Sequence, residues 1–240
     1  MTYCLGIKLN SGIVAISDTR ITSGTLTTTA KKYKVYQTDS HKVFLMTSGL
    51  RSVRDKTLTY FSQHMKKKLN DFEQMYEVVN AFGNNLKQVA NEDKSILQES
   101  GLEFNLFTII GGQLPGDDEH KLYLVYPEGN WIEIGEGFPF TIIGNSGFGT
   151  PLLRRTINYS SSIRFALKTG FLSFDSTRVS ANDVGYPIDV MVYKKNSNKI
   201  IVKRYEEKDL ARVSKFWGTR LTEAIKDVPD SWMHQELIDD

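Results

Sequence analysis

The alternation of apolar and polar positions in the first half of the chain predicts strands followed by two helices. Two runs rich in β-formers, 3–9 and 13–17, flank the turn Asn10-Ser11-Gly12 and predict a hairpin. A polar Ser/Thr-rich stretch follows at 22–29 and predicts a loop with edge strands. A second hairpin is predicted for 34–37 and 42–47. Apolar residues then recur at helical spacing, which predicts two consecutive amphipathic helices over 50–69 and 75–97.

In the second half of the chain, predicted strands are again followed by predicted helices. Strands are predicted at 104–110, 121–126, 131–134 and 140–143, followed by helical patterns at 151–158 and 162–174. A final hairpin pairs 188–193 with 199–205, and a last helix covers 207–226. The polar end, 229–240, is expected to be a loosely held tail.

Strands and helices therefore come in separate groups. A parallel doubly wound sheet would alternate strand and helix, so the order favours an α+β fold of antiparallel sheets with helices packed outside them. No internal repeat and no low-complexity segment interrupts the chain, and we expect one domain over residues 1–240.

Composition excludes several classes of protein. The formal net charge of +2 is too small to indicate nucleic acid or an acidic membrane as a partner. The single cysteine, Cys4, cannot form an intramolecular disulfide and fits a reducing compartment. No signal peptide and no apolar run long enough for a membrane span is present, so we expect a cytoplasmic protein.

Cofactor and metal motifs are missing as well. The four histidines are scattered without ligand spacing, and Gly111-Gly112 lacks the Gly-Lys-Ser/Thr that completes a phosphate-binding loop. We therefore expect neither a cofactor nor a metal ion.

The N-terminus carries the first candidate for chemistry. Methionine aminopeptidases remove Met1 when a small residue such as Thr2 follows. Residue 2 would then offer a hydroxyl nucleophile together with its own α-amine, whose ordinary pKa of about 7.7–8.0 suits a general base. A chain that keeps Met1 is expected to be inert.

Three further positions could complete such a site. Antiparallel pairing of the first hairpin brings Asp18 back beside residue 2. Lys34 begins the next strand, and a carboxylate–lysine pair there would disfavour protonation of the neighbouring amine. The Ser48-Gly49 step lies where a strand gives way to a helix, and backbone N–H groups at a helix start can bind an oxyanion.

These residues together resemble proteasome β-subunits and the bacterial HslV peptidase. The resemblance rests on Thr2, Ser17-Asp18-Thr19-Arg20, Lys34 and Ser48-Gly49. Within that superfamily, Met1-Thr2-Tyr3-Cys4 is most similar to the bacterial ancestral β-subunit (Anbu) group, and so are two later motifs. These are Gly144-Asn145-Ser146-Gly147-Phe148-Gly149-Thr150-Pro151 and Gly185-Tyr186-Pro187-Ile188-Asp189.

The resemblance implies a set of roles. Thr2 attacks the scissile carbonyl through its Oγ, and its own amine takes the proton. Asp18 and Lys34 orient and polarise this hydroxyl–amine pair, and the N–H of Gly49 stabilises the oxyanion. Ser146 and Asp183 would complete the hydrogen bonds around the amine.

Two positions leave that last part of the network open. Asn145 is an alternative to Ser146, and Tyr186 stands where proteasome β-subunits usually carry a serine. The resemblance also implies a four-layer αββα sandwich and assembly into a homo-oligomer, either a ring or an open helical ring.

Other catalytic motifs fit the sequence less well. Gly144-Asn145-Ser146-Gly147 lacks the glycine at position 148 that a nucleophile elbow needs, and Cys4 lies inside a strand pattern. Three functions stay open: a threonine peptidase acting on peptides or unfolded proteins, a catalytically weak or inactive scaffold of the same fold, and an N-terminal-nucleophile (Ntn) amidohydrolase of small amides. The sequence does not fix substrate preference, which would depend on side chains around Gly24, Lys32 and Gly49, or the presence of an ATP-driven unfoldase.

Overall fold

A computed structural model describes residues 2–23, 26–197 and 199–234 of the chain. The chain divides into two compact units, residues 1–205 and 206–240.

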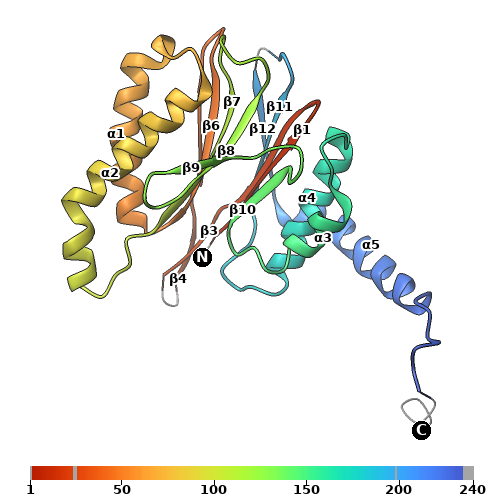
Figure 1. The fold of residues 1–240 in the computed structure, drawn as a ribbon. Coiled ribbons are helices and arrows are strands. Elements are labelled where there is room, and N and C mark those ends of the chain that lie inside the picture. Colours follow the sequence, from red (N-terminus) through yellow and green to blue (C-terminus); the bar gives the residue numbers. More distant parts are fainter. Residues whose placement is uncertain (1, 24–25, 198, 235–240) are drawn as a thin grey trace. The chain divides into compact units, whose positions relative to one another are not determined.

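Two five-stranded antiparallel sheets form the centre of the first unit (Figure 1). The first sheet has the strand order β10-β1-β2-β11-β12, and the second has the order β5-β6-β7-β8-β9. The first sheet contains β1 (Tyr3–Leu9), β2 (Gly12–Asp18), β10 (Phe140–Gly144), β11 (Ile188–Lys194) and β12 (Ile200–Tyr205). The second contains β5 (Tyr33–Gln37), β6 (Lys42–Gly49), β7 (Leu106–Gln113), β8 (Lys121–Val125) and β9 (Trp131–Glu133).

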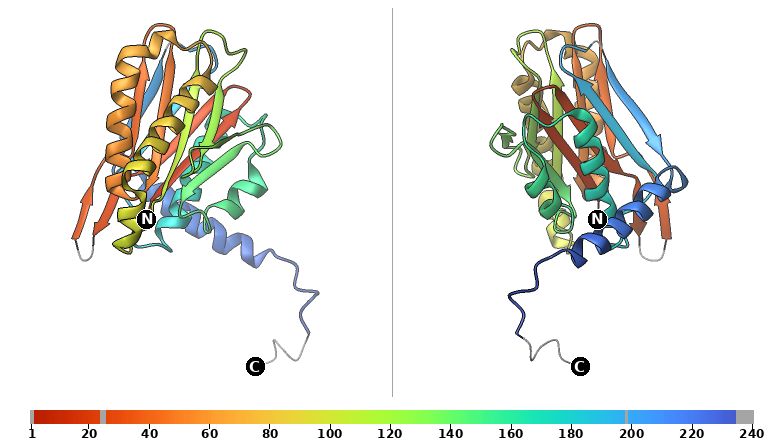
Figure 2. Two further views of the ribbon diagram at one scale, coloured as in Figure 1. Left: turned by 60° about the vertical axis from the view of Figure 1, so that its left-hand side comes forward. Right: turned by 90° about the vertical axis from the view of Figure 1, so that its right-hand side faces the viewer.

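Helices cover the outer faces of the two sheets (Figures 1 and 2). The second sheet carries α1 (Arg51–Lys68) and α2 (Met75–Glu99), joined by a short 3-10 turn at Leu69–Asp71. The first sheet carries α4 (Ile163–Arg178), which follows α3 (Thr150–Thr156). The layers are therefore helices, sheet, sheet and helices, and the α+β prediction of an αββα sandwich is confirmed.

The alternation of side chains along β6 shows how one strand serves two cores. Val43 and Leu45 pack with α1 and α2, whereas Phe44 and Met46 point between the sheets and meet Ile109 of β7. Successive side chains of a strand face opposite sides, so a strand buried on both faces must be apolar at nearly every position. This explains the continuous apolar runs that predicted β1, β2 and β6.

The Ser/Thr-rich stretch forms a two-stranded ribbon, β3 (Arg20–Ser23) with β4 (Leu26–Thr29). The sequence predicted a loop with edge strands here, and the exposed positions of β4 agree with that prediction.

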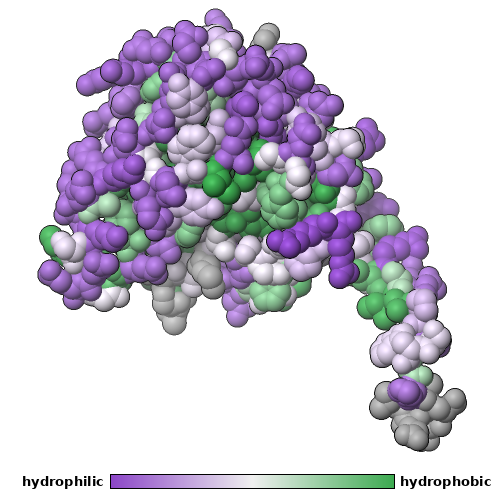
Figure 3. Space-filling view, viewed as in Figure 1, coloured by the Kyte–Doolittle hydropathy of each residue, from purple (hydrophilic) through white to green (hydrophobic). Residues whose placement is uncertain are grey.

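Unit two contains α5 (Glu207–Lys226), which begins with a capping box between Glu206 and Asp209. None of its residues is buried, and its apolar side chains include Phe216 and Ile225, which are 59% and 70% exposed. Figure 3 shows green, hydrophobic surface on the C-terminal unit. The prediction that α5 belongs to a single domain over residues 1–240 stays a prediction. The predicted tail, 229–240, lies partly outside the described residues.

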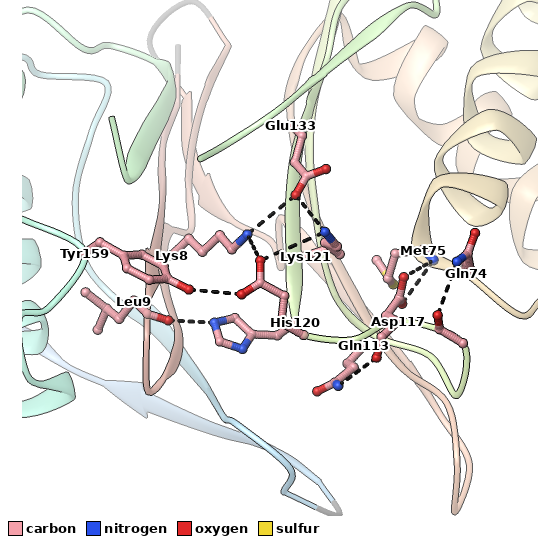
Figure 4. Close-up of polar contacts among 12 residues, drawn as sticks. Lys8, Leu9, Gln74, Met75, Gln113, Asp117, His120, Lys121, Glu133 and Tyr159 are labelled. Carbon is pink, nitrogen blue, oxygen red and sulfur yellow. Dashed lines mark hydrogen bonds and ion pairs between the residues drawn. The ribbon is translucent and has the colours of Figure 1, made fainter. Parts of the chain in front are cut away.

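A polar cluster joins the two sheets at the end that carries the β1–β2 turn (Figure 4). Lys8 of β1 is 2% exposed, and its Nζ lies 2.8 Å from Oε1 of Glu119 and 3.5 Å from Oε1 of Glu133. His120 Nε2 lies 2.6 Å from the carbonyl oxygen of Leu9. These contacts cross from the first sheet to the second, so they fix the spacing of the sheets at this end.

Candidate active site

Thr2 lies at the opposite end of the sandwich from the β1–β2 turn, directly before β1, and is 8% exposed. Its carbonyl oxygen accepts a hydrogen bond of 2.7 Å from the N–H of Asn145. Gly144 has a φ of 87°, and a Cβ at this position would collide with the Thr2 carbonyl. Only glycine permits this conformation and this approach without strain, so Gly144 sets the position of residue 2.

Asp18 ends β2 beside the start of β1, as the hairpin predicts. The register pairs Ser17 with Cys4, which places the Asp18 carboxylate next to the backbone of Tyr3. Oδ1 of Asp18 accepts a hydrogen bond of 2.9 Å from the N–H of Tyr3. The side chain is fully buried, and burial raises the pKa of the Asp18 carboxyl while the nearby ammonium of Lys32 opposes the rise.

The lysine that pairs with Asp18 is Lys32. Its Nζ lies 2.6 Å from Oδ1 of Asp18, and its side chain is 3% exposed. A pair this well buried is uncommon, because removing both charges from water costs several kcal/mol per ion unless they meet each other. Lys32 also lines the same cleft as Thr2.

The prediction that Lys34 forms this ion pair is wrong. Lys34 and Tyr36 lie on the helix-facing side of β5, where the Lys34 ammonium donates to Oγ of Ser62 at 2.8 Å and the Tyr36 hydroxyl lies 2.8 Å from the same oxygen. Lys32 precedes β5, so strand alternation does not determine where its side chain points.

Gly49 ends β6, and Leu50 leads directly into α1. The φ of Gly49 is 150°, and a Cβ there would collide with the carbonyl oxygen of Asn105, so the turn requires glycine. Leu50 donates its N–H to that same oxygen at 2.8 Å. The strand-to-helix step that the sequence singled out therefore exists and borders the cleft.

A cleft of about 690 Å³ opens beside Thr2. It is bordered by residue 2, β3, the end of β6, the start of α1, the beginning of β7 with the segment before it, and the end of β10. Its lining residues are Thr2, Arg20, Ile21, Thr22, Lys32, Ser48, Gly49, Leu50, Arg51, Arg54, Glu103, Asn105, Phe107 and Gly144.

Ser146 and Asp183 are placed differently from these residues. Ser146 is exposed on the loop after β10, and its carbonyl oxygen accepts hydrogen bonds from the N–H and the hydroxyl of Thr150 at the start of α3. The residue of this loop that contacts Thr2 through its backbone is Asn145. Asp183 is half-buried on the loop between α4 and β11. The part assigned to both residues stays a prediction.

Sequence reasoning missed two kinds of lining residue. Lys32 was named only as a position that could influence substrate preference, and its pairing with Asp18 was assigned to Lys34 instead. Arg20 and Arg54 were not singled out, although both line the cleft. Gly24 and Met1, named in the sequence analysis, lie outside the described residues.

Comparison with known proteins supports the arrangement of these elements. The family model for proteasome subunits matches residues 2–177. The chain belongs to the proteasome subunit family. Curated proteins provide no matching sequence.

Solved structures of proteasome-family proteins named Anbu, the ancestral β-subunit, are similar over nearly the whole chain. Anbu from Yersinia bercovieri is 26% identical with a TM-score of 0.88, covering 97% of this chain and 100% of that one. A mutant Anbu from Hyphomicrobium sp. strain MC1 is 27% identical with a TM-score of 0.87, covering 95% and 99%. The resemblance to the Anbu group is therefore confirmed.

A third proteasome-family structure is described as a helical assembly of the Anbu complex from Pseudomonas aeruginosa. It is 24% identical, with a TM-score of 0.87, and covers 95% of this chain and 97% of that one. At this identity the comparison shows a shared fold.

Among the described residues no group of histidine, cysteine, aspartate or glutamate side chains could hold a metal ion. The described helices also include none long and apolar enough to cross a membrane.

Proposed function

We propose that this proteasome-family chain is a threonine-type Ntn hydrolase that cleaves amide bonds in peptides or unfolded proteins after Met1 is removed. The observation that carries the proposal is the buried Asp18–Lys32 ion pair beside residue 2. Burying two charges costs free energy, and buried charged groups cluster at functional sites. Here the buried pair lies next to a hydroxyl that needs activation.

The proposed reaction uses Thr2 twice. Its α-amine takes the proton from Oγ, directly or through a water molecule, while Oγ forms a bond to the scissile carbonyl carbon. When the tetrahedral intermediate collapses, the C–N bond breaks and the leaving amine receives that proton. Water then attacks the resulting ester with the amine again as base, which releases the acid and restores Thr2.

Lys32 and Asp18 influence these reaction steps through their charges. The ammonium of Lys32 disfavours protonation of a neighbouring amine, so more of that amine stays basic near neutral pH. Asp18 fixes the ammonium at 2.6 Å and also holds the backbone of Tyr3, the next residue along from the nucleophile. In this proposal Lys32 takes the part that the sequence assigned to Lys34.

The remaining assignments concern the donor to the oxyanion and the hydrogen bonds around the amine. The N–H of Gly49 is the proposed donor to the oxyanion, because Gly49 borders the cleft together with Thr2. Ser146 and Asp183 are proposed to complete the hydrogen bonds around the amine, with Asn145 as the alternative to Ser146. None of these steps calls for a cofactor.

Assembly of several copies into a ring or open helical ring is part of the same proposal. The helical assembly described for the Pseudomonas aeruginosa relative supports it. Enclosing the active sites in this way would restrict them to chains that can enter. Cytoplasmic location also stays a prediction.

The two lysines on either side of Tyr33 provide a matched test. Full-length protein is first checked by intact mass for loss of Met1 and then treated with a peptide epoxyketone, an electrophile that captures both the amine and the hydroxyl of an N-terminal threonine. The wild type should gain one adduct per chain and Thr2→Ala none. Lys32→Met should slow adduct formation by about a hundredfold or more, because activation of the base is lost. Lys34→Met should react like the wild type.

Three results would redirect the interpretation. A processed wild type that forms no adduct, like Thr2→Ala, favours the scaffold function. Turnover of glutamine or other small amides without any cleavage of peptides favours the Ntn amidohydrolase. Equal adduct rates for Lys32→Met and Lys34→Met would remove the ion pair from the mechanism.

A further inference from the structure

The wall of the cleft beside Thr2 carries more positive than negative charge. Arg20, Lys32, Arg51 and Arg54 line it, and Glu103 is the one carboxylate among the lining residues. Because Asp18 already neutralises Lys32, the arginines decide what charge a bound side chain meets.

The guanidinium of Arg54 is held in place by Asp55. Its side chain is 14% exposed, and its Nε and Nη2 lie 2.9 and 2.7 Å from Oδ1 of Asp55. A guanidinium has five N–H donors, so this contact fixes the group and leaves donors on its other edge. A fixed arginine loses little entropy when it binds a carboxylate.

Arg51 shares the same carboxylate. Its Nε lies 3.4 Å from Oδ2 of Asp55, and its side chain is 71% exposed. One carboxylate therefore serves two guanidinium groups, and one positive charge of this set is left without a counter-charge. Arg20 of β3 donates to the neutral carbonyl oxygen of Asn182 at 2.8 Å.

The start of α1 adds to this field. Its first turn contains no acidic residue, and Leu50 at the N-cap offers no side-chain hydrogen bond. Helix N-termini carry partial positive charge, which favours acidic residues in the first turn, whereas the first turn of α1 carries Arg51 and Arg54. The positive charges of two arginines are repelled by the partial positive charge of the helix N-terminus. An anion bound between the two arginines would offset that repulsion.

We propose that the cleft selects an acidic side chain, glutamate or aspartate, on the residue whose carbonyl Thr2 attacks, and that Arg54, assisted by Arg51, recognises it. This inference rests on the proposed function, because it takes the reaction to be amide cleavage by Thr2. The preference for an acidic side chain can also be measured as binding, without cleavage. Glu103 opposes such a side chain, while Ile21 and Phe107 offer contacts that an apolar side chain could also use.

The test compares peptides that differ only in charge. Acyl tripeptide aminocoumarins ending in Glu, Gln or Leu are assayed with Met1-free full-length protein, because Glu and Gln have the same shape. The Glu peptide should show kcat/KM about tenfold or more above the Gln peptide, as expected for charge-assisted hydrogen bonds. Raising NaCl from about 50 mM to about 500 mM should reduce this ratio, since exposed charges are screened.

Substitutions identify the recognising residue. Arg54→Met should bring the Glu/Gln ratio to within about threefold of unity, because the charged group that distinguishes the two peptides is removed. Arg51→Gln, at a more exposed site, should lower the ratio partly and serves as the second variant if Arg54→Met unfolds. Arg164→Met is the control, since Arg164 occupies the first turn of α4 and does not line this cleft.

The outcomes separate the inference from the proposed function. Equal cleavage of Glu and Gln peptides, or a preference for Leu, overturns the inference and leaves the hydrolase standing. If no peptide is cleaved, the proposed function fails. Anisotropy of fluorescein-labelled Glu and Gln peptides bound to Thr2→Ala then decides: tighter binding of the Glu peptide supports the inference, and equal binding overturns it.

Discussion

Replacing Lys32 by methionine tests whether the ion pair next to residue 2 also holds the fold together. The substitution keeps the length of the side chain but removes the ammonium that lies 2.6 Å from Oδ1 of Asp18. Asp18 then remains fully buried with the N–H of Tyr3 at 2.9 Å and no counter-charge from position 32. Breaking a buried pair by removing one partner typically costs about 3–5 kcal/mol.

For a domain of this size each kcal/mol lowers Tm by about 2–4 °C, so Lys32→Met should melt about 6–20 °C below the wild type. The loss should also depend on pH. Burial already raises the pKa of Asp18, and without Lys32 it rises further, so the folded state binds a proton more readily than the unfolded state. The variant should therefore lose more stability at pH 8 than at pH 5, because stability falls as pH rises through the raised pKa.

Urea unfolding at both pH values, monitored by circular dichroism, measures this difference. Lys34→Met is the matched control, since it removes a half-buried hydrogen bond to Ser62 and should cost about 1 kcal/mol with little change between the two pH values. If Lys32→Met is no less stable than Lys34→Met, or if its loss is larger at pH 5, the reasoning about the buried pair is refuted.

Three more predictions concern other parts of the first unit. Burial lowers the pKa of His120 below its ordinary 6.5, so on acidification the unfolded chain is protonated before the folded protein. The free energy of unfolding should therefore fall as the pH drops below about 6.5. In urea unfolding between pH 7 and pH 5, His120→Gln should make this fall shallower, and an equally steep fall would contradict the reasoning. The side chain of Lys8 is 3% exposed and that of Lys121 is 25% exposed, so Lys8→Met should reduce the free energy of unfolding by about 1–3 kcal/mol more than Lys121→Met. Equal losses would argue that the polar cluster does not hold the two sheets together. Gly144→Ala should slow adduct formation at Thr2 by about tenfold or more, since strain at its positive φ costs about 1–2 kcal/mol and the new Cβ would displace the Thr2 carbonyl; Gly135→Ala, where a Cβ meets open space, should leave the adduct rate unchanged.

Much of the fold was readable from the chain because local patterns and tertiary structure agree. The strands with continuous apolar runs, β1, β2 and β6, are those buried on both faces. The apolar spacing of α2 matches its buried face, which includes Val78, Phe82 and Leu86. Such positions repeat with the period of their element, so a single sequence contains the information.

The candidate site was readable only in part. Thr2 and Asp18 follow from the hairpin, because antiparallel pairing of neighbouring strands forces their ends together. Gly49 follows from the change of period between β6 and α1. Each of these inferences uses residues close in the chain or an element whose geometry is fixed.

The choice between Lys32 and Lys34 was left to the tertiary structure. Both lysines belong to one basic run. No local pattern indicates which ammonium pairs with Asp18 and which donates to Ser62 on α1. The same holds for the charge of the cleft, which combines Arg20 from β3 with Arg51 and Arg54 from α1. The sequence by itself determined the elements, their order and the nucleophile candidate, since these depend on periodicity and on neighbouring residues. Packing two sheets face to face decided the partner of Asp18 and the lining of the cleft, because those contacts join segments whose distance in space no local pattern encodes.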